Sequence, residues 1–255
     1  MKIVTFNLRC WWAEEDGINN FLHRLGLISE RIHQDLPDVI GFQEVGARQY
    51  VYLERLLPEY TLVGQLRNAD FTGEGLYVAA RKETMQVLAH NTFWLSPAPY
   101  EPGSRFEEQS DCPRICNAVR LRHRESGTIF RVFNLHLDHV GEEARQKGMG
   151  CVLEEVTRLN RQSQFPSVIL GDFNSKPGSE AINMCKRYQP YPVEDVTANI
   201  NHTFHAYGTV ENTKIDFIFM TKEFSSNVSA TGIWDDKVHG IYLSDHYPVW
   251  ADVDV

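Results

Sequence analysis

Two short polar motifs, far apart in the chain, contain residue types that suit phosphate-ester chemistry. Gly171-Asp172-Phe173-Asn174 follows the apolar run Ser167–Leu170, and Ser244-Asp245-His246 lies near the C-terminus. An acid at a strand end can hold or deprotonate a water, and an amide can donate to a phosphate oxygen. Either motif alone could be a turn, since Asp and Asn favour Asx turns. Together they predict metal-assisted hydrolysis of a phosphate ester.

Three oxygen-bearing side chains are candidates for the metal end of such a site. Glu44 follows the run Val39–Gln43, and it is either a metal ligand or a charge that favours the start of the next helix. Asn7, late in the first expected strand, is either a structural amide or a group that orients the metal ligand and the phosphate. Asp245 could reach the metal or the water. Because Mg²⁺ prefers hard oxygen ligands and keeps several waters, we expect Mg²⁺ or Mn²⁺.

Two histidines could act on the phosphate. Strand alternation places Asn134 and His136 on one face, where His136 is either a satisfied buried histidine or a donor to a phosphate oxygen. Asp216 lies in the apolar run Ile215–Phe219, and an unpaired buried charge there would be costly. We expect His246 to be its partner, since an Asp–His pair keeps the imidazole oriented and charged.

The elements that must position these residues alternate between strands and helices. Helical periodicity marks four segments: 20–36, 47–57, 142–160 and 179–187. Strand-like segments are expected at 2–9, 38–43, 60–65, 75–81, 85–95, 115–122, 128–137, 167–170, 214–220, 227–234 and 249–253. The segment 96–113 is predicted to be a long loop of the kind that is often functional. No linker divides the chain, so we expect one α/β domain over residues 1–255 with largely antiparallel sheets.

Composition narrows the partners. The 255 residues are 42% hydrophobic with a net charge of −9, which argues against a protein that grips long nucleic acid along a basic stripe. The five cysteines show no Cys-x-x-Cys spacing and are expected to be free thiols. No secretory signal pattern opens the sequence and no apolar run approaches the roughly 20 residues of a membrane span. We therefore expect a cytoplasmic protein with a phosphoester substrate, no membrane association and no protein partner.

In this order along the chain, these residues resemble the endonuclease/exonuclease/phosphatase superfamily, from Asn7 to Pro248. The resemblance implies a four-layer α/β sandwich, in which two mostly antiparallel sheets pack face to face with helices outside. It also implies a role for each polar residue. Glu44 would be the main metal ligand, supported by Asn7 and Asp245. Asp172 would position or activate the water, Asn174 and His136 would bind phosphate oxygens, and His246 with Asp216 would stabilise the transition state or donate a proton.

Further positions match narrower branches of the superfamily. In the deoxyribonuclease-like branch, Glu74 would pair with His136, and Arg114 would contact the phosphate unless it is a surface arginine at a strand start. The segments 92–96 and 203–205 resemble a compact bacterial subgroup, in which Trp94 and His205 would line the leaving-group pocket by stacking. Packing in the core explains Trp94 equally well.

We therefore expect a phosphodiesterase or nuclease acting on nucleic acid or nucleotides. A phosphomonoesterase acting on a phosphorylated small molecule is the alternative, and a non-catalytic binding module is a third hypothesis that predicts lost site residues. The leaving-group pocket, expected between the loop 96–113 and Trp11-Trp12, would discriminate the first two. A narrow basic pocket favours a small polyphosphorylated molecule, and an open aromatic groove favours nucleic acid.

Overall fold

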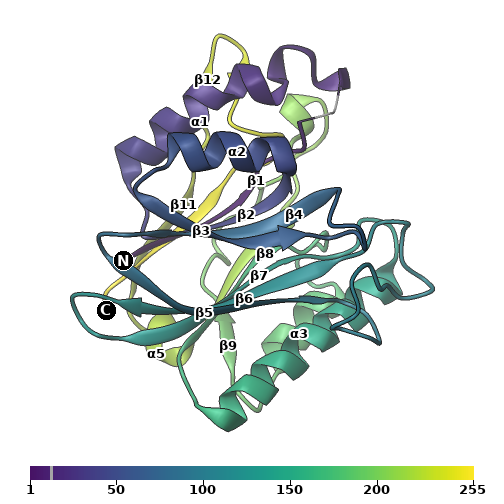
Figure 1. Cartoon of the computed structure of the whole chain (residues 1–255), viewed down its shortest axis with the longest axis vertical. Helices are drawn as coiled ribbons and strands as arrows, with labels where there is room; N and C mark the ends of the chain where they lie inside the picture. The colour runs from purple at the N-terminus through teal and green to yellow at the C-terminus, as the bar shows by residue number, and fades with distance from the viewer. Residues whose placement is uncertain (12–13) are drawn as a thin grey trace.

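Two six-stranded sheets pack face to face and carry helices on their outer sides. The computed structural model describes residues 1–11 and 14–255, so Trp12 lies outside the described residues. Helices α1 (Phe21–Asp35) and α2 (Ala47–Leu56) cover one sheet, while α3 (Glu142–Gln162) and α4 (Glu180–Arg187) pack on the other (Figure 1). The predicted four-layer α/β sandwich is therefore confirmed.

Each sheet combines one parallel pair with antiparallel neighbours. The first sheet has the order β11 (Val228–Ile233), β14 (Val249–Val253), β1 (Lys2–Asn7), β2 (Val39–Gly46), β4 (Glu74–Arg81) and β3 (Tyr60–Leu66). The second has the order β5 (Met85–Trp94), β6 (Ile115–His123), β7 (Ile129–His136), β8 (Ser167–Asp172), β10 (Asp216–Thr221) and β9 (Val193–Asp195). The pairs β1–β2 and β7–β8 are parallel and the others are antiparallel.

Several short elements were not predicted from the sequence. They are the 3₁₀ helices η1 (Glu14–Asn19) and η2 (Ala206–Gly208), the helix α5 (Lys222–Ser225), the strand β9, and the hairpin β12 (Lys237–Val238) with β13 (Ile241–Tyr242). Such elements span too few residues for a periodic pattern to appear. Among the described helices, none is long and apolar enough to cross a membrane.

Strand alternation divides the apolar side chains between three core regions. Ile3 of β1 and Val132 of β7 belong to the core between the sheets, whereas Val4 packs under α1 and Phe133 packs under α3. The same alternation turns the residues in step with Ile3 and Val132, which are Asn7, Asn134 and His136, toward the facing sheet. The inter-sheet space therefore becomes polar at the end where the central strands finish.

A buried hydrogen-bond network joins the two sheets beneath that polar end. Gln43 Nε2 donates to Asn134 Oδ1 at 2.7 Å, and Asn134 Nδ2 donates to the Phe42 carbonyl at 2.9 Å. Gly41 lies beside this network, where a Cβ atom would come within 2.2 Å of Leu170 Cδ1 on the other sheet. The absence of a side chain at Gly41 therefore allows the two sheets to approach closely directly below the site.

Candidate active site

The predicted site residues converge where the central strands of both sheets end. Asn7 ends β1, His136 ends β7 and Asp172 ends β8. Parallel strands bring their carboxyl ends to one edge of a sheet, and β7 pairs His136 directly with Asp172. Asp216 begins the antiparallel strand β10 and is also paired in register with Asp172. The site therefore straddles both sheets.

Asp172 lies at the centre of the constellation. Its Oδ2 accepts a hydrogen bond from Asn7 Nδ2 at 2.9 Å and lies 3.5 Å from His136 Nε2 and 3.8 Å from His246 Nε2. Its Oδ1 accepts from the backbone N–H of Asn174 at 2.8 Å. Burial, together with the charge of Asp216, raises the pKa of this carboxyl to about 7. A carboxyl with this pKa can accept a proton from a water near neutral pH.

The glycine before Asp172 has a conformational role. Gly171 has φ of 145°, and a Cβ atom at this position would lie 2.0 Å from the carbonyl oxygen of Leu135 on β7. Glycine is the residue that tolerates such close approach of two backbones. The Gly-Asp order in the first motif therefore sets how near Asp172 lies to the end of β7.

His246 and Asp216 form the predicted acid–histidine pair. Nδ1 of His246 lies 2.8 Å from Asp216 Oδ2 in a buried hydrogen bond. Burial alone would lower the pKa of His246, but the charge and hydrogen bond of Asp216 outweigh it and raise that pKa to about 10. The backbone N–H of Asp216 in turn donates to Thr203 Oγ1 at 3.1 Å. The imidazole is thus held as a cation with Nε2 directed toward Asp172.

Glu44 occupies a distorted stretch of β2. The register of β2 against β4 shifts between Phe42 and Val45, and Glu44 itself has φ of 59°. Bulges and left-handed non-glycine residues are common next to active sites, where they redirect a side chain. Oε1 of Glu44 accepts from Asn7 Nδ2 at 3.0 Å, and Oε2 accepts from the backbone N–H of Cys10 at 3.1 Å. Although burial opposes it, the Asn7 hydrogen bond and nearby cations lower the pKa of Glu44, which keeps it ionised.

Asn7 acts as a bridge between the two key carboxylates. Its amide nitrogen donates to both Glu44 and Asp172, while its Oδ1 accepts from the backbone N–H of Arg9 at 3.0 Å. Of the two roles left open by the sequence, this geometry matches the orienting one. Asn7 therefore fixes the spacing between the ligand expected to bind metal and the group expected to hold the water.

The donor set fits a hard divalent cation. Glu44, His136 and Asp172 each offer a ligand atom, and these atoms lie within 4.8 Å of one another. Asp245 lies nearby, where burial and the Glu44 charge raise its pKa despite the opposing charge of His246. Its carboxylate accepts from Ser244 Oγ at 3.1 Å and lies 3.7 Å from Arg9 Nε. Buried carboxylates that repel one another are the arrangement that a Mg²⁺ or Mn²⁺ ion would relieve.

The side-chain amide of Asn174 is partly engaged within the protein. It has φ of 46°, and its Nδ2 donates to the carbonyl of Leu137 at 3.0 Å. An amide nitrogen has two hydrogens, so one remains for a phosphate oxygen. The Asx-type contact from the Asn174 backbone to Asp172 shows that the motif forms the turn, and the turn leaves the second amide hydrogen of Asn174 available.

The structure does not show the predicted pair between Glu74 and His136. Glu74 instead forms a short ion pair with Arg67, a residue that sequence reasoning missed. Arg67 directly follows β3 and was indistinguishable from a surface arginine in the sequence. Arg114 is buried, 4% exposed, with Nη2 2.8 Å from His139 Nδ1 and Nε 3.8 Å from Asp138 Oδ1. The side of the site next to His136 is therefore flanked by two partly neutralised guanidinium groups.

The two predicted stacking residues are both buried. Trp94 is 3% exposed, packs against Leu76 and Ile115, and donates Nε1 to the Arg67 carbonyl at 2.6 Å. This placement matches the packing alternative and leaves no open ring face for a leaving group. His205 is 1% exposed and stacks on Tyr247, with ring centroids 4.0 Å apart. Because its ring is covered, His205 could influence a substrate only indirectly, through the residues that surround it.

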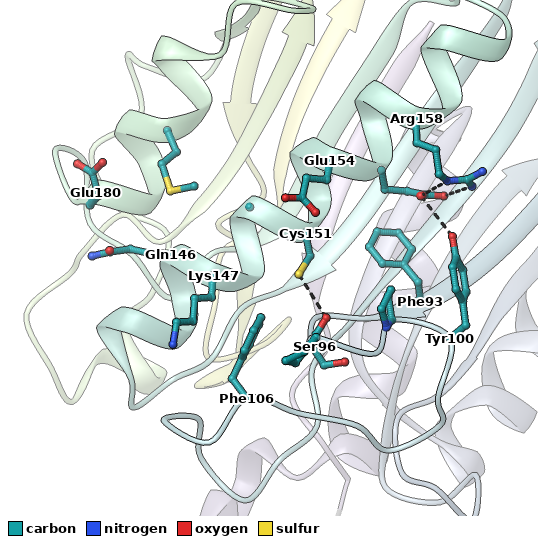
Figure 2. Close-up of a pocket in the computed structure, with 15 residues that line it drawn as sticks. Phe93, Ser96, Tyr100, Phe106, Gln146, Lys147, Cys151, Glu154, Arg158 and Glu180 are labelled. Atoms are coloured by element: carbon teal, nitrogen blue, oxygen red, sulfur yellow. Dashed lines mark hydrogen bonds and ion pairs between the residues drawn. The ribbon is translucent and has the colours of Figure 1, made fainter.

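The long loop forms a pocket at a different place from the one expected. A cavity of about 770 Å³ lies between the first part of the loop and α3, walled by Tyr100 and Phe106 on one side and by Cys151 and Glu154 on the other (Figure 2). The described residues that line it include none of the predicted catalytic side chains. Only the later part of the loop reaches the site, where Ser110 hydrogen-bonds Asp138. The expectation that residues 96–113 as a whole enclose the leaving group is therefore not supported.

Comparison with known proteins agrees with this geometry. The family model described as "Endonuclease/Exonuclease/phosphatase family" matches residues 5–246. The chain is 31% identical to an endonuclease/exonuclease/phosphatase from Bacteroides vulgatus, with a TM-score of 0.91 over 100% of this chain and 98% of the other. It is 29% identical to a functionally unknown conserved protein from Enterococcus faecalis, with a TM-score of 0.89 over 100% and 99%.

A third solved structure, the mannosyl-6-phosphatase of Bacteroides thetaiotaomicron, has 24% identity and a TM-score of 0.86 over the whole of both chains. At this identity the likeness concerns the fold alone. No curated protein matches the chain in sequence. The family match over nearly the whole length, and the site that straddles the two sheets, lead to one conclusion: the chain belongs to the endonuclease/exonuclease/phosphatase family.

Proposed function

We propose that this chain is a divalent-metal-dependent phosphodiesterase that acts on nucleotides or nucleic acid. The observation that supports this most is the environment of Asp172, whose carboxylate is close to both His136 and His246. A phosphate seated between these groups would meet a base, a neutral donor and a cation within one small volume. This combination suits in-line attack of water on phosphorus.

Asp172 is the residue proposed to take the proton of the attacking water. Its pKa of about 7 makes it a stronger base than an ordinary carboxylate while leaving much of it ionised at neutral pH. Asn7 and the backbone of Asn174 hold its two oxygens in fixed directions. The water would therefore meet a base whose orientation is set before substrate binds.

The two histidines differ in charge and therefore in role. Burial and the charge of Arg114 lower the pKa of His136 well below the ordinary value, so His136 binds a phosphate oxygen as a neutral donor. His246 carries the opposite shift because of Asp216 and remains an imidazolium. We propose that His246 stabilises the charge that develops on phosphorus and can give its Nε2 proton to the leaving oxygen.

Glu44 would hold the metal ion, with Asn7 and Asp245 beside it. A bound Mg²⁺ or Mn²⁺ would neutralise negative charge on the phosphate. Within the chain, the ionised state of Glu44 is maintained by Asn7 and by the charges of His246 and Arg9. Glu44 is therefore proposed to remain an anionic ligand although it is buried.

Parallel assays of bis(p-nitrophenyl) phosphate and p-nitrophenyl phosphate test the proposal, each with Mg²⁺, Mn²⁺ or EDTA. Diester cleavage that EDTA abolishes and that His246→Ala removes would support a phosphodiesterase. The exposed His90 gives a matched control, because His90→Ala changes the same residue type away from the site. Metal-independent cleavage, or equal loss in His90→Ala, would contradict the proposed mechanism.

A phosphomonoesterase acting on a small molecule is the second candidate. A void lined by Arg67 and Arg114 adjoins His136, the proposed phosphate donor, and a monoester dianion carries more charge for two guanidinium groups to bind than a diester does. The net charge of −9 also disfavours a long polyanion. Cleavage of the monoester alone in the same assay would select this candidate.

A further inference from the structure

Two arginines lie directly opposite each other on neighbouring strands of the second sheet. Arg120 on β6 and Arg131 on β7 are paired in register. Strand alternation puts both on the same face as Ala118 and Phe133, which belong to the core region under α3. Like charges in such a cross-strand pair repel each other and destabilise the sheet. The pair is therefore unfavourable unless negative charge compensates it.

The hydrogen-bond partners of the two arginines do not supply that negative charge. Arg131 is 5% exposed and donates to three neutral acceptors at the end of α3, which are Asn160 Oδ1 and the carbonyl oxygens of Leu159 and Ser163. The described residues give Arg120 no hydrogen bond or ion pair, and its Nε is buried without an acceptor. Burial and the charge of Arg120 lower the pKa of Arg131. A buried charged donor without an acceptor costs free energy that a bound anion would restore.

A pocket of about 170 Å³ lies against this arginine pair. Arg120, Arg131 and Arg158 line it, and the partner of Arg120 on β5 is the small residue Ala89. Glu155, which pairs with Arg158 at 2.6 Å, is the one carboxylate among the described residues that line the pocket. The lining therefore carries an excess of two positive charges, in a chain whose net charge is −9.

The size and the place of this pocket define the ligand it suits. Pockets for drug-sized molecules hold roughly 300–1,000 Å³, so about 170 Å³ suits one small anionic group better than a whole nucleotide. Guanidinium groups match the oxygens of a phosphate with paired hydrogen bonds. Arg131 precedes His136 by five residues on β7, which at about 3.3 Å per residue puts it about 16 Å from the catalytic end of the strand. A ligand here is therefore not the phosphate that the active site would hydrolyse.

We infer that Arg120, Arg131 and Arg158 form a second anion site, which binds a phosphate group between the outer face of the second sheet and α3. Arg120 is the main donor, because the described residues leave its guanidinium without another acceptor. Arg158 adds charge from α3, and Arg131 joins the site to the end of that helix. Binding at this site involves no metal ion and none of the proposed catalytic residues, so it does not depend on the proposed function.

Titration with inorganic phosphate in calorimetry tests the site, with EDTA present and the ionic strength held constant with sodium chloride. Arg120→Gln should lose this binding or weaken it at least about tenfold, because charged hydrogen bonds are removed. Arg122→Gln is the matched control and should bind as the wild type does, since Arg122 lies on the same strand, is exposed and does not line the pocket. Arg158→Gln, at an exposed position, should also weaken binding and serves if Arg120→Gln does not fold.

Thermal unfolding gives a second readout, in which the effect of Arg120→Gln depends on phosphate. Without phosphate, the Tm of this variant should equal or exceed that of the wild type, because the repulsion with Arg131 is relieved. Added phosphate should raise the Tm of the wild type and of Arg122→Gln, and should raise that of Arg120→Gln less. Methyl phosphate distinguishes the sources of the group: equal affinity selects a phosphate carried on a larger ligand, and much weaker affinity selects the free ion.

Three results would overturn the inference. They are a wild-type protein that does not bind phosphate, a phosphate affinity and Tm gain that are the same in Arg120→Gln, and an equal loss in Arg122→Gln. Because EDTA is present throughout, these results leave the proposed metal-dependent hydrolysis untouched. Absence of hydrolysis in the nitrophenyl ester assays would equally leave the anion site standing.

Discussion

Replacing Asp216 with asparagine should convert His246 from a cation into a neutral imidazole under mildly alkaline conditions. The substitution keeps the size of the side chain and removes the charge that lies 2.8 Å from His246 Nδ1. Asp216 is the first of the groups that raise the pKa of His246, against a burial effect that lowers it. Without Asp216, we expect that pKa to fall from about 10 to the ordinary value of 6.5 or below.

The expected loss of hydrolysis rate in Asp216→Asn depends on pH. With a pKa of about 10, His246 is almost fully protonated at pH 8, whereas with a pKa near 6.5 only about 3% is protonated. Loss of the cation alone would thus lower the rate about 30-fold at pH 8 and less than about twofold at pH 6. Because the pKa of His246 is raised, the stability that the charged imidazole gives the folded wild-type protein is complete below about pH 6.5 and is lost as pH rises through about 10.

The assay is a pH profile of kcat/KM for the hydrolysed nitrophenyl ester, with saturating metal, for wild type and Asp216→Asn. Titration of the His246 ring by NMR would report the pKa directly. Asp254→Asn provides the matched control, because Asp254 is exposed near the end of the chain. A loss of equal size at pH 6 and pH 8, or an unchanged His246 pKa, would refute the view that Asp216 retains the imidazolium.

Three further substitutions test other parts of the site. Glu44→Ala should weaken Mg²⁺ binding in calorimetry, and unchanged affinity would remove Glu44 as a ligand. Asp172→Asn should abolish turnover yet raise the free energy of unfolding at pH 8 by up to about 4 kcal/mol, because a carboxyl whose pKa is raised from 3.8 to about 7 is destabilising when ionised. That gain should vanish toward pH 4, and a pH-independent gain would contradict its electrostatic origin. Gly41→Ala should cost about 1–3 kcal/mol in urea unfolding through overpacking against Leu170, while Gly26→Ala, with open space around it, should not destabilise.

Residues whose positions follow from strand alternation or from the cost of a buried charge were predictable from the sequence. Asn134 and His136 share a face of β7, and Asp216 needed a charged partner because its strand is otherwise apolar. The structure places His246 beside Asp216 as expected. Both predictions needed only local sequence information: the periodicity of the strand, and an acid in an apolar run that would be costly to bury without a partner.

Contacts between distant segments were not predictable in the same way. The resemblance paired Glu74 with His136, and only the folded path of β3 into β4 shows that Arg67 reaches Glu74. Trp94 carries no sequence sign of facing the core or solvent at the end of its strand, and the fold buries it. The loop after β5 is joined to α3 by contacts between distant side chains, such as Tyr100 with Glu155 and Lys147 with Glu108, which single-sequence periodicity does not contain.

The pairing of the first strand with the last one has a consequence for biosynthesis. β14 lies between β11 and β1, and His246 is contributed by the segment just before it. A chain that ends before this segment contains every strand of the second sheet and still lacks both β14, the neighbour of β1, and His246. Under the proposed function, the site would be complete only after this C-terminal segment has docked, so truncated chains that lack it would be inactive.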